Sequence, residues 1–442
     1  MGIPYYFASL IRAHKGLTSR VGGLQTPDVF AIDFNCLIHT YMDDANPIES
    51  IIVALREILT NTCKATKYVY IAMDGLVPYA KIVQQRYRRF RIPDKTPTFD
   101  RHQISPETPY MKELAIAVRQ AFPTAIVSDT SEQGEGEHKL LLWLKTLPET
   151  HRRSITVYGL DADLILLCLS QKNLSKPYGF NLLRENISFN NEKPGFSTLS
   201  IWKLADKLDI PIEQYLWLSV MCFGNDFVPS LAIFSLREGC QERALSYYEE
   251  ADKPDLNTPE GRSNFMKVAA RHELHVLKEK VNKRKKSGER AIVAMDGDKL
   301  RERYNLHILD GVRDSTPVVE AYWNIVVWTH TYFTTNTAPS WSIHYPYPDA
   351  PLVCQIVDVI HKTPVFSHPT PTYKTSNQLQ FILPSQSLRT AKKRVLFPDE
   401  FYHEETDVRM PWMKRYVWES KPRISLPWSV NETQTKIEAW SW

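Results

Sequence analysis

In the first half of the chain, short apolar runs alternate with stretches of helical periodicity. We predict buried strands at Val29–Phe34, Tyr68–Met73, Ala125–Ser128 and Ile155–Tyr158. Helical patterns lie between or beside them, at Ile48–Thr60, Tyr79–Arg89, Pro109–Ala121 and Glu137–Leu144. This alternation is typical of an α/β fold, in which a mostly parallel, twisted sheet is flanked by helices. Ligands of such folds bind beyond the carboxyl ends of the strands, so the residues at those ends are the first candidates for function.

The pattern changes after about residue 245. Glu249–Arg262 is polar, and the charged helical stretch after it ends in the basic run Lys283–Lys286. We interpret that run as a solvated helix face, with a nuclear signal or an RNA contact as alternatives. From Pro317 the chain becomes aromatic and proline-rich. We therefore predict a catalytic α/β domain at 1–245, a linker with a charged helical segment at 246–316, and a helix- and aromatic-rich region at 317–442 that packs on the first domain and completes its pocket.

Composition narrows the class of protein. The chain has 442 residues, 43% of them hydrophobic, which is enough for a large core. Its six cysteines show no CxxC spacing, which argues against structural zinc and for a reducing compartment; we expect a cytoplasmic protein, with a nuclear one as the alternative. No run approaches the ~20 apolar residues of a membrane span. The apolar segment Met1–Ile11 has no basic segment before it, so we predict a packed helix and not a signal peptide. We expect a monomer, and the sequence identifies no protein partner.

Acidic residues recur where the predicted strands end. One aspartate after one strand is usually a turn residue, and a glutamate before a helix is usually a cap. Several carboxylates at one end of a sheet would raise each other's pKa unless a cation neutralised them. Mg²⁺ or Mn²⁺ suits such oxygen ligands, and two ions about 4 Å apart can clamp a phosphodiester. The candidate catalytic and metal-binding residues are Asp33, Asp74, Glu135, Glu137, Asp161, Asp163 and Asp226.

The spacing of these acids also suggests local geometry. Asp161 and Asp163 lie two residues apart, so on an extended segment both carboxylates would point the same way. Gly134 and Gly136 would let the chain bend tightly around Glu135 and Glu137.

A basic helix face follows the second predicted strand. In the segment YAKIVQQRYRRFR, side chains at i, i+4, i+7 and i+8 share one face. Arginine offers a planar fork for phosphate oxygens and lysine a point charge, so this face fits a terminal phosphate; a solvated basic helix is the alternative. The residues of this predicted phosphate pocket are Lys81, Gln85, Arg88 and Arg89.

Several motifs together resemble one known family, the 5′-to-3′ exoribonucleases of RNA decay. In the first half they are MGIP at 1–4, DFN at 33–35 with His39, AMDG at 72–75, KIVQQRYRRFR at 81–91, GEGEHK at 134–139, YGLDADL at 158–164, LLRE at 182–185 and GNDFVP at 224–229. SWSIHYPY at 340–347, QLQFILP at 378–384 and KRYVWE at 414–419 extend the resemblance over nearly the whole chain. GEGEHK, GLDADL and GNDF in this order are highly specific.

The resemblance implies a fold, an activity and roles for residues. The fold would have a core like that of PIN and flap nucleases, with a second region packed on it. The enzyme would degrade single-stranded RNA with a 5′-monophosphate processively to nucleoside 5′-monophosphates, with two metal ions held by the seven acids. His39 would stack on the first base, with Trp341 on its other side, although the family has a second aromatic where this chain has Ile343. Because family members usually continue with further domains, we expect a compact, core-only homologue, reminiscent of a viral one.

Two other functions remain as alternatives. A flap endonuclease acting on DNA shares the sheet, the metals and an N-terminal MGI, but it usually has EAEA-type and GCDY-type motifs and a glycine-rich helix-hairpin-helix. This chain has GEGEH and GNDF, and the segment after Asp226 shows no such hairpin. A catalytically inactive protein that binds RNA 5′ ends would be expected to lose some acids, and all seven are present.

Overall fold

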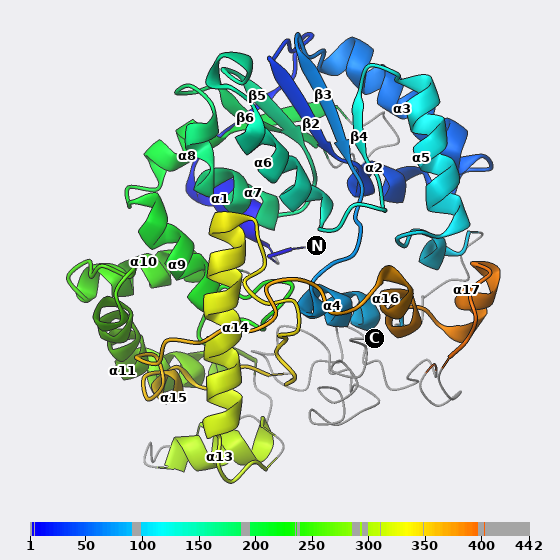
Figure 1. Ribbon diagram of the computed structural model, residues 1–442. Coiled ribbons are helices and arrows are strands. Elements are labelled where there is room, and N and C mark those ends of the chain that lie inside the picture. Colours follow the sequence, from blue (N-terminus) through cyan, green and yellow to red (C-terminus); the bar gives the residue numbers. More distant parts are fainter. Residues whose placement is uncertain are drawn as a thin grey trace.

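A seven-stranded, mostly parallel sheet forms the centre of the protein (Figure 1). The computed structural model describes residues 2–3, 5–90, 99–186, 195–234, 236, 239–284, 292–293, 299–309, 311–347, 349–396 and 402. The strands are β1 (Thr18–Arg20), β2 (Val29–Asp33), β3 (Tyr68–Ala72), β4 (Ile126–Ser128), β5 (Ile155–Tyr158), β6 (Phe180–Glu185) and β7 (Phe196–Ser200). Their order across the sheet is β1-β7-β6-β5-β2-β3-β4.

The parallel part of the sheet confirms the predicted fold class. The four predicted strands are β2, β3, β4 and β5, and β2 lies between β3 and β5 with both neighbours parallel. The sequence did not predict β1, β6 and β7. The short β1 and polar β7 lack a strong apolar pattern, and β7 pairs antiparallel with β6 and with β1. Strands of this kind depend on their partner more than on their own composition.

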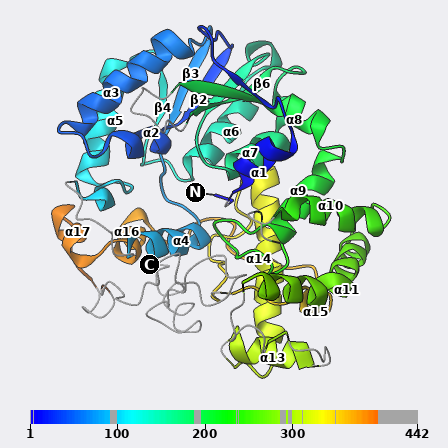
Figure 2. The ribbon, with the colours of Figure 1, turned by 180° about the vertical axis from the view of Figure 1, so that it is seen from behind.

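Helices cover both faces of the sheet because alternate residues of its strands point to opposite sides. On β2, Val29 and Ala31 belong to one apolar cluster, whereas Phe30 and Ile32 belong to another. The first cluster includes α6 (Gly136–Thr146) and α7 (Asp163–Ser170). The second includes α2 (Phe34–Tyr41), α3 (Pro47–Glu57) and α5 (Pro109–Ala121). Figures 1 and 2, seen from opposite sides, show the sheet between these layers.

The remaining helices contribute to the first cluster. They are α1 (Tyr6–Ala13), α4 (Tyr79–Arg89), α8 (Ile201–Lys207), α9 (Ile212–Cys222), α10 (Cys240–Glu250), α11 (Pro259–Arg284), α13 (Leu300–His307), α14 (Thr316–Thr335), α15 (Val353–Ile356), α16 (Thr375–Ile382) and α17 (Ser385–Thr390). Among them, α8 packs directly against β6 and β7. The charged segment is helical, as expected. One face of α11 buries Phe265, Met266 and Leu277 and contributes to the core, and the solvated face at Lys283–Lys286 stays a prediction. The domain boundaries at 245 and 317 stay a prediction.

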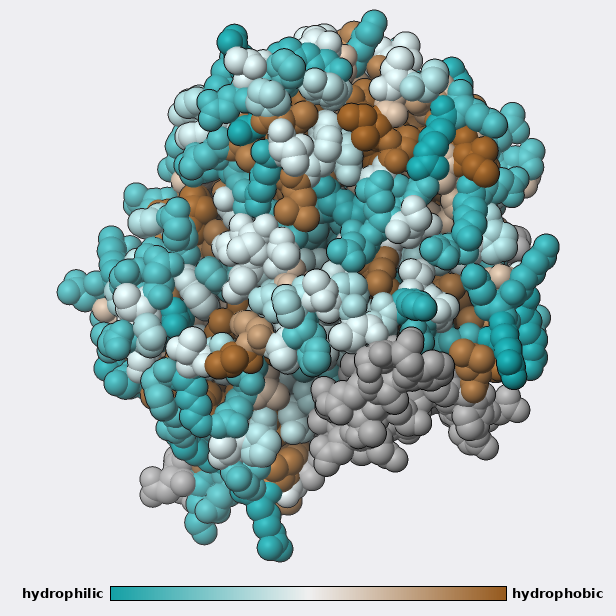
Figure 3. Space-filling model, in the orientation of Figure 1, coloured by the Kyte–Doolittle hydropathy of each residue, from teal (hydrophilic) through white to brown (hydrophobic). Residues whose placement is uncertain are grey.

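On the face drawn in Figure 3, hydrophobic side chains occur in small groups between hydrophilic ones. Within the described parts of the chain, every helix is too short or too polar to cross a bilayer.

Candidate active site

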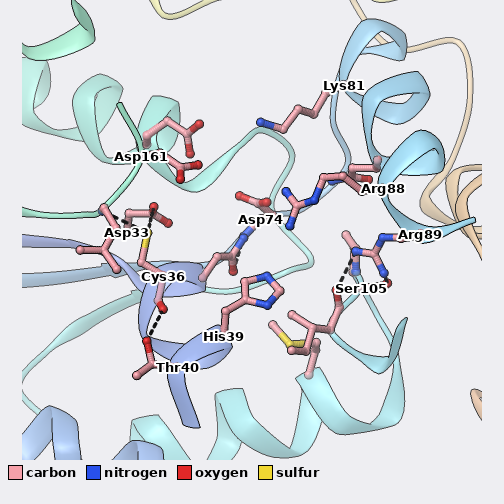
Figure 4. A pocket seen from close by; sticks show the side chains of 17 residues that line it. Asp33, Cys36, His39, Thr40, Asp74, Lys81, Arg88, Arg89, Ser105 and Asp161 are labelled. Atoms are coloured by element: carbon pink, nitrogen blue, oxygen red, sulfur yellow. Dashed lines mark hydrogen bonds between the residues drawn. The ribbon is translucent and has the colours of Figure 1, made fainter. Parts of the chain in front are cut away.

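A cavity of about 310 Å³ opens beyond the carboxyl ends of β2 and β3, where the fold class predicts a ligand. Acidic side chains come from the ends of the strands, and basic ones come from α4, which follows β3 (Figure 4). The predicted site residues that line it are Asp33, His39, Asp74, Lys81, Gln85, Arg88, Arg89, Glu137 and Asp161.

Charge interactions at short to medium range link all seven predicted acids into one cluster. Asp33 interacts with Asp74 and Asp161, and Asp161 in turn interacts with Asp163. The remaining interactions run between Asp163 and Asp226, between Glu137 and Glu135, and from Glu137 to Asp33 and Asp74. The sheet therefore gathers acids that are up to 193 positions apart in the sequence, from 33 to 226.

Burial and mutual repulsion make several of these carboxylates hard to ionise. Burial, followed by the charges of Asp74 and Asp161, raises the pKa of Asp33 to about 7. The pKa of Asp163 is raised to about 7 by burial and by the charge of Asp161. Burial and the nearby Glu135 hold the pKa of Glu137 well above its usual range. Such shifts indicate a site that is short of positive charge.

Lys81 supplies one positive charge from within the acid cluster. Its Nζ lies 2.5 Å from Glu135 Oε2 and 3.2 Å from Asp226 Oδ2, and the residue is only 6% exposed. In Figure 4 the ammonium end of Lys81 points away from α4 toward the acids. Attraction to Glu135 and Asp226 outweighs burial and holds the pKa of Lys81 well above its usual value. This lysine therefore keeps its positive charge at the centre of the site.

The donor set fits a hard divalent cation. Asp33 Oδ1 is buried and has no hydrogen-bond partner, and an orphaned oxygen of this kind suits a metal ion. Within the described residues, however, no three His, Cys, Asp or Glu side chains converge closely enough to hold one ion as they stand. Metal binding would therefore require small side-chain movements.

The local backbone differs in one respect from the prediction. Asp161 and Asp163 do not share an extended segment, because Ala162 is helical and Asp163 is the first residue of α7. The helix begins there, so the two carboxylates meet through a turn and not through strand alternation. The glycine prediction is supported: Gly134 has φ +111°, and a Cβ on Gly136 would lie 3.2 Å from Asp33 Oδ1.

The predicted phosphate pocket forms the basic wall of the cavity. Arg88 is exposed, and its guanidinium points into the cavity in Figure 4. Arg89 already donates to the carbonyl of Ile104 at 2.9 Å and to Ser105 Oγ at 2.5 Å, so the loop at 102–105 holds it in place. Gln85 accepts a hydrogen bond from Gln378 of α16 at 3.3 Å.

The two predicted stacking residues are not on the same wall. His39 lines the cavity. Partial loss of hydration, together with the positive charges of Arg88 and Arg89, lowers the pKa of its ring to about 4. It is therefore a neutral ring at physiological pH. Trp341 is 6% exposed, packs near Tyr373 with ring centroids 6.4 Å apart, and is not among the residues that line the cavity. Its stacking role stays a prediction, without support from this arrangement.

Comparison with known proteins identifies a protein family whose model matches part of this chain. The XRN 5′-3′ exonuclease N-terminus family matches residues 1–98 and 92–186. 5′-3′ exoribonuclease 1 of Saccharomyces cerevisiae is 27% identical over 57% of this chain and 21% of its own length. 5′-3′ exoribonuclease 2 of Candida glabrata is 26% identical over 69% of this chain and 42% of its own length. The first 186 residues of this chain are thus similar to the N-terminal part of XRN 5′-3′ exonucleases.

The chain spans less than half the length of those two relatives. Among solved structures, the catalytic core of Rad2 in complex with a DNA substrate covers 88% of this chain and 95% of its own, at 12% identity and a TM-score of 0.39.

Three side chains of the candidate site were not singled out from the sequence. Cys36 Sγ donates a hydrogen bond to Asp33 Oδ2 at 2.9 Å and accepts one from the backbone amide of Leu160 at 3.3 Å. Tyr332 of α14 donates to Glu135 Oε1 at 2.9 Å. Lys139 Nζ donates to the carbonyls of Met73 and Asp129, at 2.7 and 2.8 Å, and so fixes the chain beside Asp74.

The sequence carries a local pattern for two of these three residues but not for the third. Cys36 follows Asp33 by three residues, and Lys139 is the last residue of the GEGEHK motif. Both could therefore have been predicted from their distance to a candidate acid in the sequence. Tyr332 lies 197 residues from Glu135, and no local pattern connects them. The KRYVWE motif and the end of the Lys283–Lys286 run lie outside the described residues.

Proposed function

We propose that this chain is a processive 5′-to-3′ exoribonuclease that hydrolyses 5′-monophosphorylated single-stranded RNA to nucleoside 5′-monophosphates. The observation that carries the proposal is one cavity with an acidic wall, which includes Asp33 and Asp161, and a basic wall, which includes Arg88. The acidic wall suits the cations that phosphodiester hydrolysis uses, and the basic wall suits a terminal phosphate. The names of the relatives, 5′-3′ exoribonuclease 1 and 2, support RNA as the substrate.

Two Mg²⁺ or Mn²⁺ ions are the proposed cofactors. When bound, they would lower the pKa of a water molecule and stabilise the charge that develops on the phosphodiester. The side chains proposed to hold them are Asp33, Asp74, Glu135, Glu137, Asp161, Asp163 and Asp226.

The basic wall would determine where hydrolysis begins. Arg88, with Gln85, Arg89 and Lys81, would hold the terminal phosphate, and His39 would stack on the first base. A phosphate held there places the next linkage beside the acids, because both walls line the same cavity. Cleavage of the bond between phosphorus and the 3′ oxygen leaves a new 5′-phosphate on the shortened RNA. Each product is thus the next substrate, which suits processive action.

Hydrolysis of one RNA in several forms tests this proposal. We expect Mg²⁺-dependent release of mononucleotides from 5′-monophosphate RNA, and much slower reaction of the 5′-hydroxyl, 5′-triphosphate and circular forms. Cleavage of circular RNA at a comparable rate would exclude dependence on the 5′ end. Preference for a DNA flap would indicate a flap endonuclease, and binding without hydrolysis would indicate a 5′-end-binding protein.

A further inference from the structure

The position of Lys81 raises a question that its place in a phosphate pocket does not answer. Its Nζ contacts Glu135 and Asp226, at 2.5 and 3.2 Å, and both of these are proposed metal ligands. The same lysine lines the cavity with Gln85, Arg88 and Arg89. One side chain therefore lies on the basic wall of the cavity by its position on α4 and contacts two acids, Glu135 and Asp226, that do not line the cavity.

We propose that Lys81 is a switch that couples recognition of the 5′-phosphate to metal loading. Without a 5′-phosphate its ammonium occupies part of the acid cluster and competes with a divalent ion for Glu135 and Asp226. A bound 5′-phosphate draws the ammonium toward Arg88 and frees those carboxylates for the metal. This inference rests on the proposed function and deepens it, because it makes the correct RNA end a condition for assembling the active site.

Charge and geometry support the competition. A protonated lysine and a divalent ion both neutralise carboxylates, so they bind Glu135 and Asp226 in mutually exclusive ways. The ammonium is held in place by ion pairs to Glu135 Oε2 at 2.5 Å and to Asp226 Oδ2 at 3.2 Å. It leaves only if another anion receives it. A terminal phosphate is such an anion, and it would bind on the wall from which the flexible lysine stem projects.

The other side chain that contacts Glu135 does not carry a charge. Tyr332 also contacts Glu135, but it uses Oε1, whereas Lys81 uses Oε2. A neutral hydroxyl stabilises the ionised carboxylate without opposing a cation. The described residues contain no three acids that converge closely enough for one ion, and a lysine lies among them. This is the arrangement expected for a site closed to metal until the lysine moves.

Mn²⁺ binding to the full chain, measured by calorimetry and by electron paramagnetic resonance, tests the proposal without relying on hydrolysis. The probe is a 5′-phosphorylated RNA dinucleotide with a non-cleavable linkage, compared with its 5′-hydroxyl form. In the wild type, we expect the 5′-phosphorylated probe to raise the Mn²⁺ affinity about 10-fold or more, the size expected from relieving one or two charge-assisted hydrogen bonds. The reciprocal increase in probe affinity with Mn²⁺ must have the same size.

Substitution of Lys81 distinguishes a lysine that moves on phosphate binding from one that stays between the two acids. Lys81→Met keeps the stem and removes the ammonium, so we expect the RNA-free protein to bind Mn²⁺ about 10-fold more tightly and to lose most of the coupling. Arg88→Met is the matched control, since it removes a positive charge from the same cavity without freeing Glu135 or Asp226. It should weaken binding of the probe but change RNA-free Mn²⁺ affinity far less than Lys81→Met does.

Two results would overturn the switch: equal Mn²⁺ affinities in the RNA-free Lys81→Met and Arg88→Met proteins, or coupling that persists undiminished in Lys81→Met. If Lys81→Met does not fold, Lys81→Gln replaces it, and absence of coupling in the wild type is also decisive. RNA hydrolysis by the same wild-type preparation is measured in parallel. Hydrolysis without coupling contradicts the switch alone, whereas coupling without hydrolysis contradicts the proposed function alone.

Discussion

Burial of single carboxylates in the acidic wall costs folding free energy, because each loses its hydration. Asp33 has one carboxylate oxygen bonded to Cys36 and the other without a partner. Natural proteins rarely leave a buried polar atom in that state, and they do so mostly at functional sites. Three predictions follow from the charges and hydrogen-bonding groups of single side chains.

Asp161→Asn should abolish hydrolysis and leave RNA binding intact. The amide is nearly the same size, but it removes a negative charge from the proposed metal site, which weakens the clamp that stabilises the transition state. Turnover at saturating Mg²⁺ and RNA affinity by fluorescence anisotropy are the two measurements. Near-normal turnover would remove Asp161 from the site.

Arg88→Ala should reduce catalytic efficiency on 5′-monophosphate RNA roughly 10- to 150-fold, the equivalent of one charge-assisted hydrogen bond. On 5′-hydroxyl RNA the same change should have little effect, because no terminal phosphate is present. The comparison of the two substrates cancels effects on folding. An equal loss on both would mean that Arg88 serves the RNA backbone or the fold.

The raised pKa values predict how pH affects stability. Asp33 and Asp163 each have a folded pKa of about 7, above the value of an unfolded aspartate. The folded state therefore binds more protons between about pH 4 and 7, so the free energy of unfolding of the metal-free protein should fall as pH rises through that range, by more than about 1 kcal/mol. Thermal unfolding in EDTA measures this. Adding Mg²⁺ should stabilise the protein more at pH 7.5 than at pH 5, and a fall of equal size in Asp33→Asn would contradict the role of Asp33.

At the scale of elements, two helices far from each other in sequence complete the site. One face of α4 lines the cavity, while Arg86 on another face donates to the carbonyl of Phe381 in α16 at 2.6 Å. The helix α14 brings Tyr332 to Glu135, and the ring of Tyr332 stacks on His138 at a centroid distance of 3.7 Å. Glu135, the residue before α6, is thus supported from the second half of the chain.

Tyr332→Phe keeps that stacked ring and removes only the hydroxyl. Because Glu135 loses a hydrogen bond to its carboxylate, we expect a stability loss of about 1.5–3 kcal/mol and a changed Mg²⁺ dependence of hydrolysis. Tyr322→Phe, on the same helix, is the matched control, since its hydroxyl donates to the carbonyl of Pro229 at 2.9 Å. It should lose stability and keep the wild-type Mg²⁺ dependence. If both variants show the wild-type dependence, Tyr332 is structural only.

At the scale of the whole molecule, one apolar cluster joins the sheet to the second half of the chain. It runs from Leu10 and Val29 through Leu216 to Trp328 and Leu379. The predicted catalytic domain, 1–245, therefore shares its core with the rest of the chain.

A fragment of residues 1–245 should not fold stably by itself. Without α14, the faces of α7 and α9 that it covers would be exposed to water, at about 25 cal/mol for each Å² of apolar surface. Circular dichroism and limited proteolysis of the fragment measure this, and co-expression with residues 246–442 should restore protection. A cooperatively folded, protease-resistant fragment would contradict the prediction and support an independent domain.

The sequence by itself determined the features that depend on local periodicity. Alternating apolar runs predicted β2, β3, β4 and β5, and helical spacing placed Lys81, Gln85, Arg88 and Arg89 on α4. The acids at strand ends could be grouped because parallel strands carry their carboxyl ends to one edge.

Only the tertiary structure decided which groups contact one another across the chain. The antiparallel strands β1 and β7, the burial of Trp341 and the link from Tyr332 to Glu135 depend on partners far away in sequence. So does the place of Lys81: helical spacing predicts its face of α4, but packing of α4 against the sheet brings its ammonium among the acids. Local sequence patterns predict which face of a helix or strand a side chain occupies. The distance between two such side chains depends on how the elements that carry them pack together.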